Sequence, residues 1–243
     1  MMIISHKHRF IFLHTRKCAG SSIKVVLANQ LGAEDILIGS IKDYRLRGLT
    51  PPKAMTRIAL RHPHWPSVFY KLARGSYWSF VNNSIKQHYS HTLGSRPEHA
   101  PAEAVKAAFP VEWQSYKKFC VVRNPWDQLW SEYKWRYWRK TSKFSFKEFL
   151  EKTERYESYT SNWLIYTIKN KPQADRLLRY EDLKNELEHT FEWLGLKQFS
   201  DLPQAKSMGN KSADNYRAHY DSESQALVGR IRAKEIGYFG YEF

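Results

Sequence analysis

Residues 9–32 read RFIFLHTRKCAGSSIKVVLANQLG, and this stretch decides the fold. Its first part, residues 9–14, is a short apolar run of strand-forming residues. A turn of small residues follows at 18–22, after which IKVVLANQLG has apolar residues at helical spacing and closes on Gly32. The stretch therefore predicts a strand, a loop and a helix.

Two later stretches repeat this order. Residues 118–122 (KFCVV) are a second strand candidate, and the Asn-Pro pair at 124–125 suits the N-cap and first turn of a long helix that continues to about Arg139. A third unit combines residues 175–179 (DRLLR) with a helix that ends near Gly195. Strands that alternate with helices are typical of an α/β protein whose central parallel sheet is flanked by helices.

We expect one domain over residues 1–243, with a poorly predictable insertion at about 42–97 that is rich in basic residues, His and Pro. Inside the insertion, residues 67–81 are aromatic and basic. A helix that faces the core is favoured there over a helix on a membrane surface.

The composition limits the function classes. Lys and Arg number 39 against 24 Asp and Glu, a net charge of +15, and 42% of the residues are hydrophobic. The hydrophobic content excludes disorder of the whole chain, and the charge predicts an anionic partner. No apolar run is long enough for a transmembrane segment, and the opening residues do not resemble a secretory signal, so we expect a cytoplasmic protein.

The cysteines and histidines do not predict a metal site. Cys18 and Cys120 are far apart and form no CxxC, which excludes a disulfide framework and a zinc ribbon. The pairs His62/His64 and His88/His91 have metal-ligand spacing, but no Cys or carboxylate completes either set.

The first strand is followed by a candidate anion site. Gly20 allows close approach of the backbone, Ser21 and Ser22 add hydroxyl groups at the positive end of a helix, and Lys17 adds a charge. Because Lys17 precedes the glycine, the order differs from the GxxxxGK[ST] loop that binds Mg-ATP. The same residues are also compatible with an ordinary turn capped by Ser.

A second candidate follows the next strand. Arg123 offers a planar fork for a phosphate, and Ser131, seven positions after Asn124, returns to the same face of the helix. Taken alone, an Arg at a strand end is more often part of a structural salt bridge.

Together the two segments resemble sulfotransferases of the carbohydrate type, a group that includes heparan sulfate 2-O-sulfotransferases and small bacterial relatives. Residues 17–22 resemble the loop that binds the 5′-phosphosulfate, and residues 120–133 resemble the segment that binds the 3′-phosphate. Arg16 stands where the family usually has Pro, and Cys18 where it usually has Thr. Further similar segments are residues 98–103, residues 179–183, and the carboxyl end from Tyr216 through residues 239–243.

The resemblance implies a P-loop-like three-layer fold and the sulfuryl donor 3′-phosphoadenosine 5′-phosphosulfate (PAPS), with adenosine 3′,5′-bisphosphate as the product and no metal required. It places Lys17 at the bridging oxygen of the phosphosulfate and assigns the 3′-phosphate to Arg123 and Ser131. The implied donor-binding residues are Arg16, Lys17, Ala19, Gly20, Ser21, Ser22, Arg123 and Ser131.

The catalytic pair implied by the resemblance is Lys17 with a histidine base. His99 is the first choice, because the segment around it resembles the one that carries the family's catalytic His and because an imidazole titrates near neutral pH. His91 and His88 remain alternatives.

The sequence says less about which residues would bind the acceptor. Trp130, Tyr133 and Tyr137 lie on one stripe of a helix beside Lys and Arg residues, and this stripe is either part of a groove for a carbohydrate or core packing beside a solvated basic edge. Two other functions stay open, a kinase-like phosphotransferase and a non-catalytic polyanion-binding protein. Nucleic acid is not expected as a partner, and the oligomeric state is open.

Overall fold

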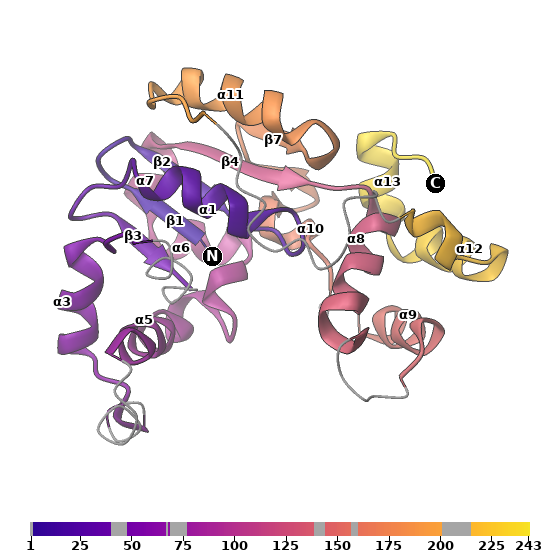
Figure 1. Ribbon diagram of the computed structural model, residues 1–243, viewed down its shortest axis with the longest axis horizontal. Helices are drawn as coiled ribbons and strands as arrows, with labels where there is room; N and C mark the ends of the chain where they lie inside the picture. Colours follow the sequence, from indigo (N-terminus) through magenta and orange to yellow (C-terminus); the bar gives the residue numbers. More distant parts are fainter. Residues whose placement is uncertain are drawn as a thin grey trace.

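The computed structural model describes residues 2–39, 48–66, 68, 77–138, 144–156, 160–200 and 215–243. Its centre is a five-stranded sheet in the order β3-β1-β2-β4-β7 (Figure 1). The strands are β1 (Met2–Ser5), β2 (Phe10–Leu13), β3 (Ile36–Ile38), β4 (Lys117–Val122) and β7 (Arg176–Arg179).

The sheet is mixed but mostly parallel. β2, β4 and β7 pair in parallel, whereas β1 is antiparallel to both of its neighbours, β2 and β3. The predicted α/β class is confirmed, with the correction that β1 reverses direction inside the sheet. The sequence analysis assigned no strand to residues 2–5, which form a hairpin with β2 through a turn that includes Arg9 at φ 53°.

The carboxyl ends of β2, β4 and β7 lie at one edge of the sheet. Leu13 pairs with Cys120, and Val122 pairs with Arg179, so the loops that follow these strands begin near one another. In open α/β sheets this edge is where ligands bind.

Apolar side chains bury the centre of the sheet. All four residues of β2 are fully buried, and so is β4 from Phe119 to Val121. The rings of Phe12 and Phe119 lie 5.1 Å apart between centroids across these strands. This packing makes β2 and β4 a rigid base for the loops that they carry.

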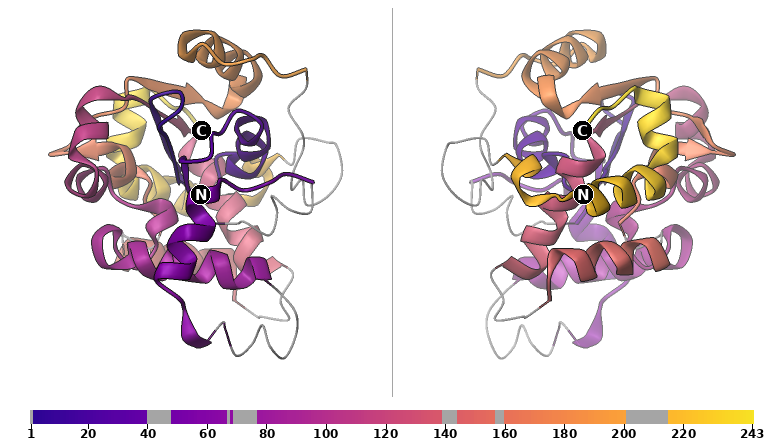
Figure 2. Two further views of the ribbon diagram at one scale, coloured as in Figure 1. Left: turned by 90° about the vertical axis from the view of Figure 1, so that its left-hand side faces the viewer. Right: turned by 90° about the vertical axis from the view of Figure 1, so that its right-hand side faces the viewer.

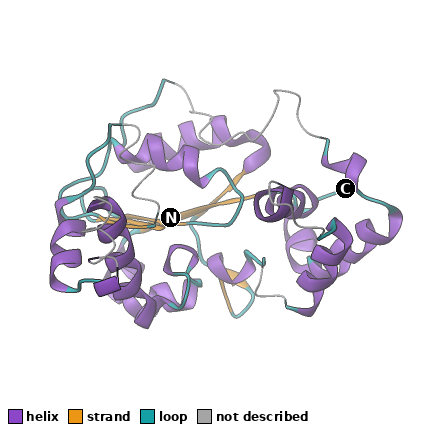
Figure 3. Cartoon of the chain, turned by 60° about the horizontal axis from the view of Figure 1, so that its bottom comes forward, coloured by secondary structure: helices purple, strands orange, loops and turns teal. Residues whose placement is uncertain are grey.

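Helices cover both faces of the sheet (Figure 3). α11 packs against β7, and α3 and α5 pack against each other and against β3. The helices are α1 (Gly20–Ala28), α3 (Lys53–Arg61), α5 (Tyr77–Leu93), α6 (Ala102–Ala108), α7 (Pro110–Ser115), α8 (Pro125–Tyr133), α9 (Phe146–Arg155), α10 (Trp163–Tyr166), α11 (Leu183–Leu194), α12 (Ser222–Ile231) and α13 (Ala233–Phe239). A short hairpin joins β5 (Thr167–Ile168) to β6 (Lys171–Pro172), and the short helical turns are η1 (Pro97–His99), η2 (Lys134–Trp138), η4 (Tyr180–Asp182) and η5 (Tyr216–His219).

A second apolar cluster lies beyond the end of β4, where α12 packs against α8 and α9 (Figure 2). Its buried members include Trp130 of α8, Phe149 of α9 and Val228 of α12. The C-terminal helices therefore complete the wall next to the loop that follows β4.

Helix ends depart from the expectation at two places. α1 begins at Gly20 and ends at Ala28, four residues before Gly32. The helix after β4 is regular only to Tyr133 and continues as the π-helical turn η2 to Trp138, while residue 139 lies outside the described residues. Gly195 ends α11 in the left-handed conformation, as expected.

The stretch 42–97 contributes two long helices, α3 and α5, and part of η1. In α5, Phe80 and Val81 are buried, which agrees with a helix that faces the core. Residues 40–47, 67 and 69–76 lie outside the described residues. Within the described ranges, none of the helices has the length and apolar character that a membrane crossing requires.

Candidate active site

The first loop, residues 14–22, connects β2 to α1 and has an unusual backbone. Lys17 (φ 60°) and Ala19 (φ 53°), the N-cap residue of α1, both adopt the left-handed conformation. In the first turn of the helix, Ser22 N–H donates to Ala19 O at 2.8 Å. The N–H groups of Gly20 and Ser21 precede it and sit at the positive end of the helix. The loop therefore presents backbone donors and Lys17 together.

Gly20 lies directly against the ring of His14. A Cβ atom at position 20 would lie 1.8 Å from His14 Nε2, and the His14 ring stacks on His99 with centroids 4.5 Å apart and an interplanar angle of 24°. A side chain here would have to displace His14 from His99. The glycine thus serves close packing inside the protein as well as any approach to a ligand.

Arg16 is held by a distant segment. Its backbone N–H donates to Asn162 Oδ1 at 2.7 Å, Asn162 Nδ2 donates to Arg16 O at 3.0 Å, and Arg16 Nη1 donates to Ser161 O at 2.7 Å. Burial lowers the pKa of Arg16 to about 10, so the guanidinium stays charged at neutral pH. Its Nε atom is buried and has no hydrogen-bond partner among the described residues.

Arg123, at the end of β4, connects the two predicted loops. Its Nη1 donates to Lys17 O at 2.7 Å, and its Nε donates to Asp127 Oδ2 at 2.8 Å. The guanidinium also stacks on the ring of Tyr180 of η4 at 3.9 Å. The sequence placed Lys17 and Arg123 at neighbouring strand ends, and the structure brings them into direct contact.

The helix after Arg123 begins as expected. Asn124 Oδ1 accepts from Trp126 N–H, and Pro125 occupies the first turn. Ser131 lies on the same helix, α8, and is half-buried.

His99 is placed beside the first loop through its contacts with His14. Its Nδ1 lies 2.8 Å from His14 O. Because a carbonyl oxygen can only accept, Nδ1 carries the proton and Nε2 is the basic nitrogen. Burial lowers the pKa of His99 well below its usual value, and the charges of Arg16 and Lys86 contribute. The imidazole is therefore neutral at neutral pH.

The alternative bases lie on α5. His88 stacks on His62 with centroids 4.2 Å apart, and burial lowers the pKa of His88. His91 is exposed in the last turn of the helix. No group of three or more His, Cys, Asp or Glu side chains suited to a metal ion occurs in the part of the chain that the structure describes.

The comparison with known proteins assigns the family. The chain matches the Sulfotransferase family over residues 1–242. It belongs to this family. Among solved structures, a sulfotransferase from Alicyclobacillus acidocaldarius is similar, with 15% identity, 97% of this chain and 96% of that chain covered, and a TM-score of 0.42. No curated protein matches the chain.

The residues of this sulfotransferase fit an anionic donor. A buried Arg16 Nε without a partner among the described residues, the N–H groups of Gly20 and Ser21, and the Lys17 ammonium are all donors around one loop. Such a set suits phosphate and sulfate oxygens.

The aromatic stripe of α8 belongs to the core of this sulfotransferase. Trp130 lies in the second apolar cluster, and Tyr133 and Tyr137 pack against it. Trp135 of η2, by contrast, is 58% exposed, and its ring lies 5.5 Å from Lys17 Nζ. The exposed aromatic ring next to the first loop is therefore Trp135, which the sequence analysis did not single out.

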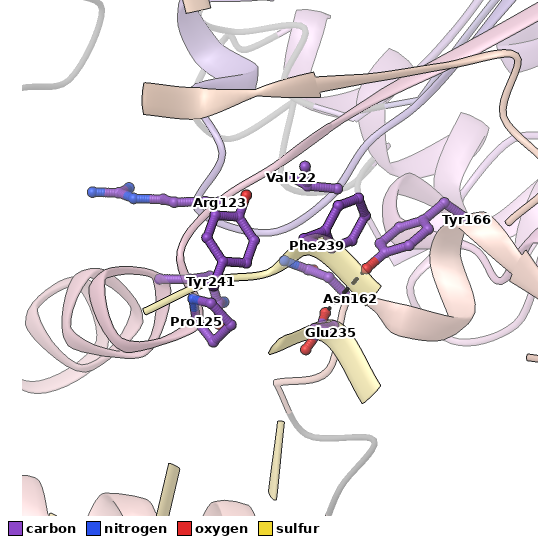
Figure 4. Close-up of a pocket in the computed structure, with 9 residues that line it drawn as sticks. Val122, Arg123, Pro125, Asn162, Tyr166, Glu235, Phe239 and Tyr241 are labelled. Carbon is purple, nitrogen blue, oxygen red and sulfur yellow. Dashed lines mark hydrogen bonds between the residues drawn. The ribbon is translucent and has the colours of Figure 1, made fainter. Parts of the chain in front are cut away.

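A small cavity lies beside the start of the second loop, with Val122, Arg123 and Pro125 in its lining. It is lined by residues that include Asn162, Glu235 and Tyr241, and its volume of about 10 Å³ suits a single water molecule, not a nucleotide. Figure 4 shows that Arg123 extends away from Asn162 and Glu235. The charged atoms of Arg123 thus lie on the other side, toward Lys17.

The residues that the sequence analysis missed all act across long sequence distances. Ser161 and Asn162 hold Arg16, Tyr180 supports Arg123, and His14 supports His99. Only Tyr180 lay inside a segment quoted for the family resemblance, and nothing in the local pattern around Ser161 and Asn162 distinguishes them from an ordinary helix start.

Proposed function

We propose that this sulfotransferase transfers the sulfuryl group of PAPS to a hydroxyl group of a carbohydrate acceptor. In this proposal, residues 1–243 form one catalytic domain in which the stretch 42–97 is an insertion. When bound, the donor supplies an activated sulfuryl group and a phosphate leaving group. The protein must bind the donor, orient the acceptor hydroxyl toward the sulfur and take up the proton of that hydroxyl.

One observation carries the proposal: Arg123 Nη1 donates to Lys17 O at 2.7 Å. The two anion-binding loops are therefore adjacent, as a donor with phosphates at both ends of one adenosine requires. Arg123 also keeps Asp127 as a partner, which fixes the plane of the guanidinium.

In the donor site, the amides of Ala19, Gly20 and Ser21 and the hydroxyl groups of Ser21 and Ser22 hold the 5′-phosphate, and Arg16 anchors the loop from which they project. Lys17 stabilises the negative charge that develops on the bridging oxygen. The 3′-phosphate binds to Arg123 and Ser131, and this group distinguishes the donor from ordinary adenine nucleotides.

His99 is the general base. Its hydrogen bond to His14 O leaves Nε2 free of a proton, and its lowered pKa keeps it neutral at physiological pH. A neutral imidazole that contacts the start of the first loop through His14 can take the proton of the attacking hydroxyl. The structure gives neither His88 nor His91 a bond to the first loop among its described hydrogen bonds, which is why His99 is preferred.

The acceptor lies against the exposed face of Trp135. An indole ring provides an apolar surface on which a sugar ring stacks, and Lys17 lies next to it. This assignment replaces the stripe of Trp130, Tyr133 and Tyr137, which is core.

The test has two parts. Thermal stabilisation by adenosine 3′,5′-bisphosphate should exceed that by Mg-ATP, and a preference for Mg-ATP would favour a phosphotransferase instead. Labelled PAPS should then transfer sulfate to a member of a panel of glycans, lipids and small alcohols, with a glycan as the best acceptor. Steeply salt-dependent binding to heparin or RNA that survives Lys17→Ala, without turnover, would instead indicate a polyanion-binding protein.

A further inference from the structure

One side chain from a remote part of the chain bonds to both backbone groups of a residue in the first loop. The Asn162 amide accepts from Arg16 N–H at 2.7 Å and donates to Arg16 O at 3.0 Å, so it satisfies both backbone groups of the residue before Lys17. Asn162 and Arg16 are separated by 146 positions. We call this pair of bonds the Asn162 clamp.

The clamp is itself firmly held. Asn162 is 6% exposed, and its backbone carbonyl accepts from Ile165 N–H at 2.9 Å in the turn of α10. The preceding residue, Ser161, accepts from Arg16 Nη1. Thr160 is fully buried and accepts from Arg232 Nη2, which ties the segment to the C-terminal helices. Figure 4 shows Asn162 among the residues between β4 and these helices.

The loop needs such support because of its backbone. Lys17 and Ala19 both have positive φ angles, which side-chain-bearing residues keep only where their surroundings determine the conformation. Arg123 holds the carbonyl of Lys17 on one side. The clamp holds the peptide groups of Arg16 on the other, so Lys17 is fixed at both ends.

We propose that Asn162 is the positioning residue of the first loop: it holds Arg16 so that Lys17 faces the donor. The proposal rests on the proposed role of Lys17. A proline at position 16, in place of Arg16, would lack the N–H, and its ring would restrict φ. The clamp satisfies the N–H that Arg16 has and restricts the backbone in place of a ring.

The decisive experiment combines Asn162→Ala with changes at position 16. Asn162→Ala alone should lower kcat by about 10- to 100-fold, because a small displacement of a reacting group has effects of this size, with a smaller change in KM for the donor. In an Arg16→Ala background, which keeps the N–H, the loss should persist. In an Arg16→Pro background, Asn162→Ala should lower kcat less, because the ring restricts φ and only the bond from Asn162 Nδ2 to the carbonyl of residue 16 is left to lose.

Asn170→Ala is the matched control. Asn170 Oδ1 accepts from Trp163 Nε1 at 3.0 Å, so this change disturbs the same segment without touching the loop. It should lower thermal stability and leave kcat nearly unchanged. If Asn162→Ala behaves in the same way, or if its loss of kcat is equal in the Arg16→Ala and Arg16→Pro backgrounds, the proposal is wrong. Asn162→Asp, which keeps the shape and the acceptor, replaces Asn162→Ala if the latter does not fold.

Amide hydrogen exchange separates this proposal from the proposed function. Peptides that cover residues 14–22 should exchange faster in Asn162→Ala than in the wild type or Asn170→Ala, whether or not sulfate is transferred. Unchanged exchange would refute the clamp. Faster exchange in a protein that neither binds adenosine 3′,5′-bisphosphate nor transfers sulfate would retain the clamp and refute the function.

Discussion

The first and second loops follow neighbouring parallel strands, yet different kinds of contact hold them. In the second loop, residues 123–127, the start of the helix is set by partners close in sequence: Asn124 caps Trp126, and Arg123 pairs with Asp127. Asn124 also donates to two remote residues, through its N–H to Glu181 Oε1 and through Nδ2 to Glu242 O. In the first loop, Arg16 depends on Ser161 and Asn162, which lie 145 and 146 positions away. The helix start of the second loop is therefore encoded locally and then tied to the rest of the domain, whereas the residue before Lys17 in the first loop is held by remote partners at both its backbone and its side chain.

One hydrogen bond, from Arg123 Nη1 to Lys17 O, connects the two loops. Through it the second loop supports the first one. The comparison predicts that changes in the first loop act on turnover, while changes in the second act on nucleotide affinity or on stability.

The largest effect is expected at Lys17. Lys17→Ala should lower kcat by about 10²- to 10³-fold, because it removes a charge aimed at the leaving oxygen, with only a modest loss of nucleotide affinity. Steady-state kinetics with PAPS measure this. Lys184→Ala, an exposed lysine of α11, is the control. Near-normal turnover of Lys17→Ala would remove its proposed role.

His99→Ala should lower kcat by about 10²-fold, the lower end of the range for general base catalysis. The pH profile is a second readout: because burial depresses the pKa of His99, wild-type kcat/KM should stay level as the pH falls through 6.5 and decline only at lower pH. The base assignment is wrong if His99→Ala keeps full activity while His91→Ala loses it.

Arg123→Ala should weaken binding of adenosine 3′,5′-bisphosphate by about 10- to 100-fold, the size expected for a lost charge-assisted hydrogen bond. Isothermal titration measures the affinity. Arg61→Ala, which removes an exposed arginine in the last turn of α3, serves as the control. An unchanged affinity in Arg123→Ala would show that the 3′-phosphate binds elsewhere.

The smallest effect is expected at Asn124. Asn124→Ala removes the cap of α8 and the bond from Asn124 Nδ2 to Glu242 O, and should cost about 2 kcal/mol of stability, a decrease in Tm of about 4–8 °C for a chain of this size, with little change in kcat. Ser145→Ala, which removes the cap of α9 alone, should have about half of this effect. A large loss of turnover in Asn124→Ala alone would contradict the distinction between the loops.

The features that the sequence predicts are those that depend on contacts between residues close in sequence. The strands β2, β4 and β7, the cap at Asn124 and the end of α11 at Gly195 are visible locally, because hydrophobic patterns and capping residues act over a few positions. The antiparallel β1 and the exposed Trp135 are not visible in this way. Their placement depends on a hairpin turn with a left-handed Arg9 and on a π-helical turn, neither of which has a clear residue pattern.

The candidate site shows the same limit. Lys17, Gly20 and Arg123 were proposed from motifs that resemble a family, and the structure brings Arg123 into contact with the backbone of Lys17. Asn162 was not identified, because a side chain that bonds to a remote backbone leaves no periodic signal in its own segment.

The most direct test of the central claim is a crystal structure of the wild-type protein with adenosine 3′,5′-bisphosphate. We predict that one nucleotide spans both loops, with its 5′-phosphate on residues 17–22 and its 3′-phosphate on Arg123 and Ser131. A nucleotide that contacts only one loop, or that binds elsewhere while both loops stay free, would contradict the claim.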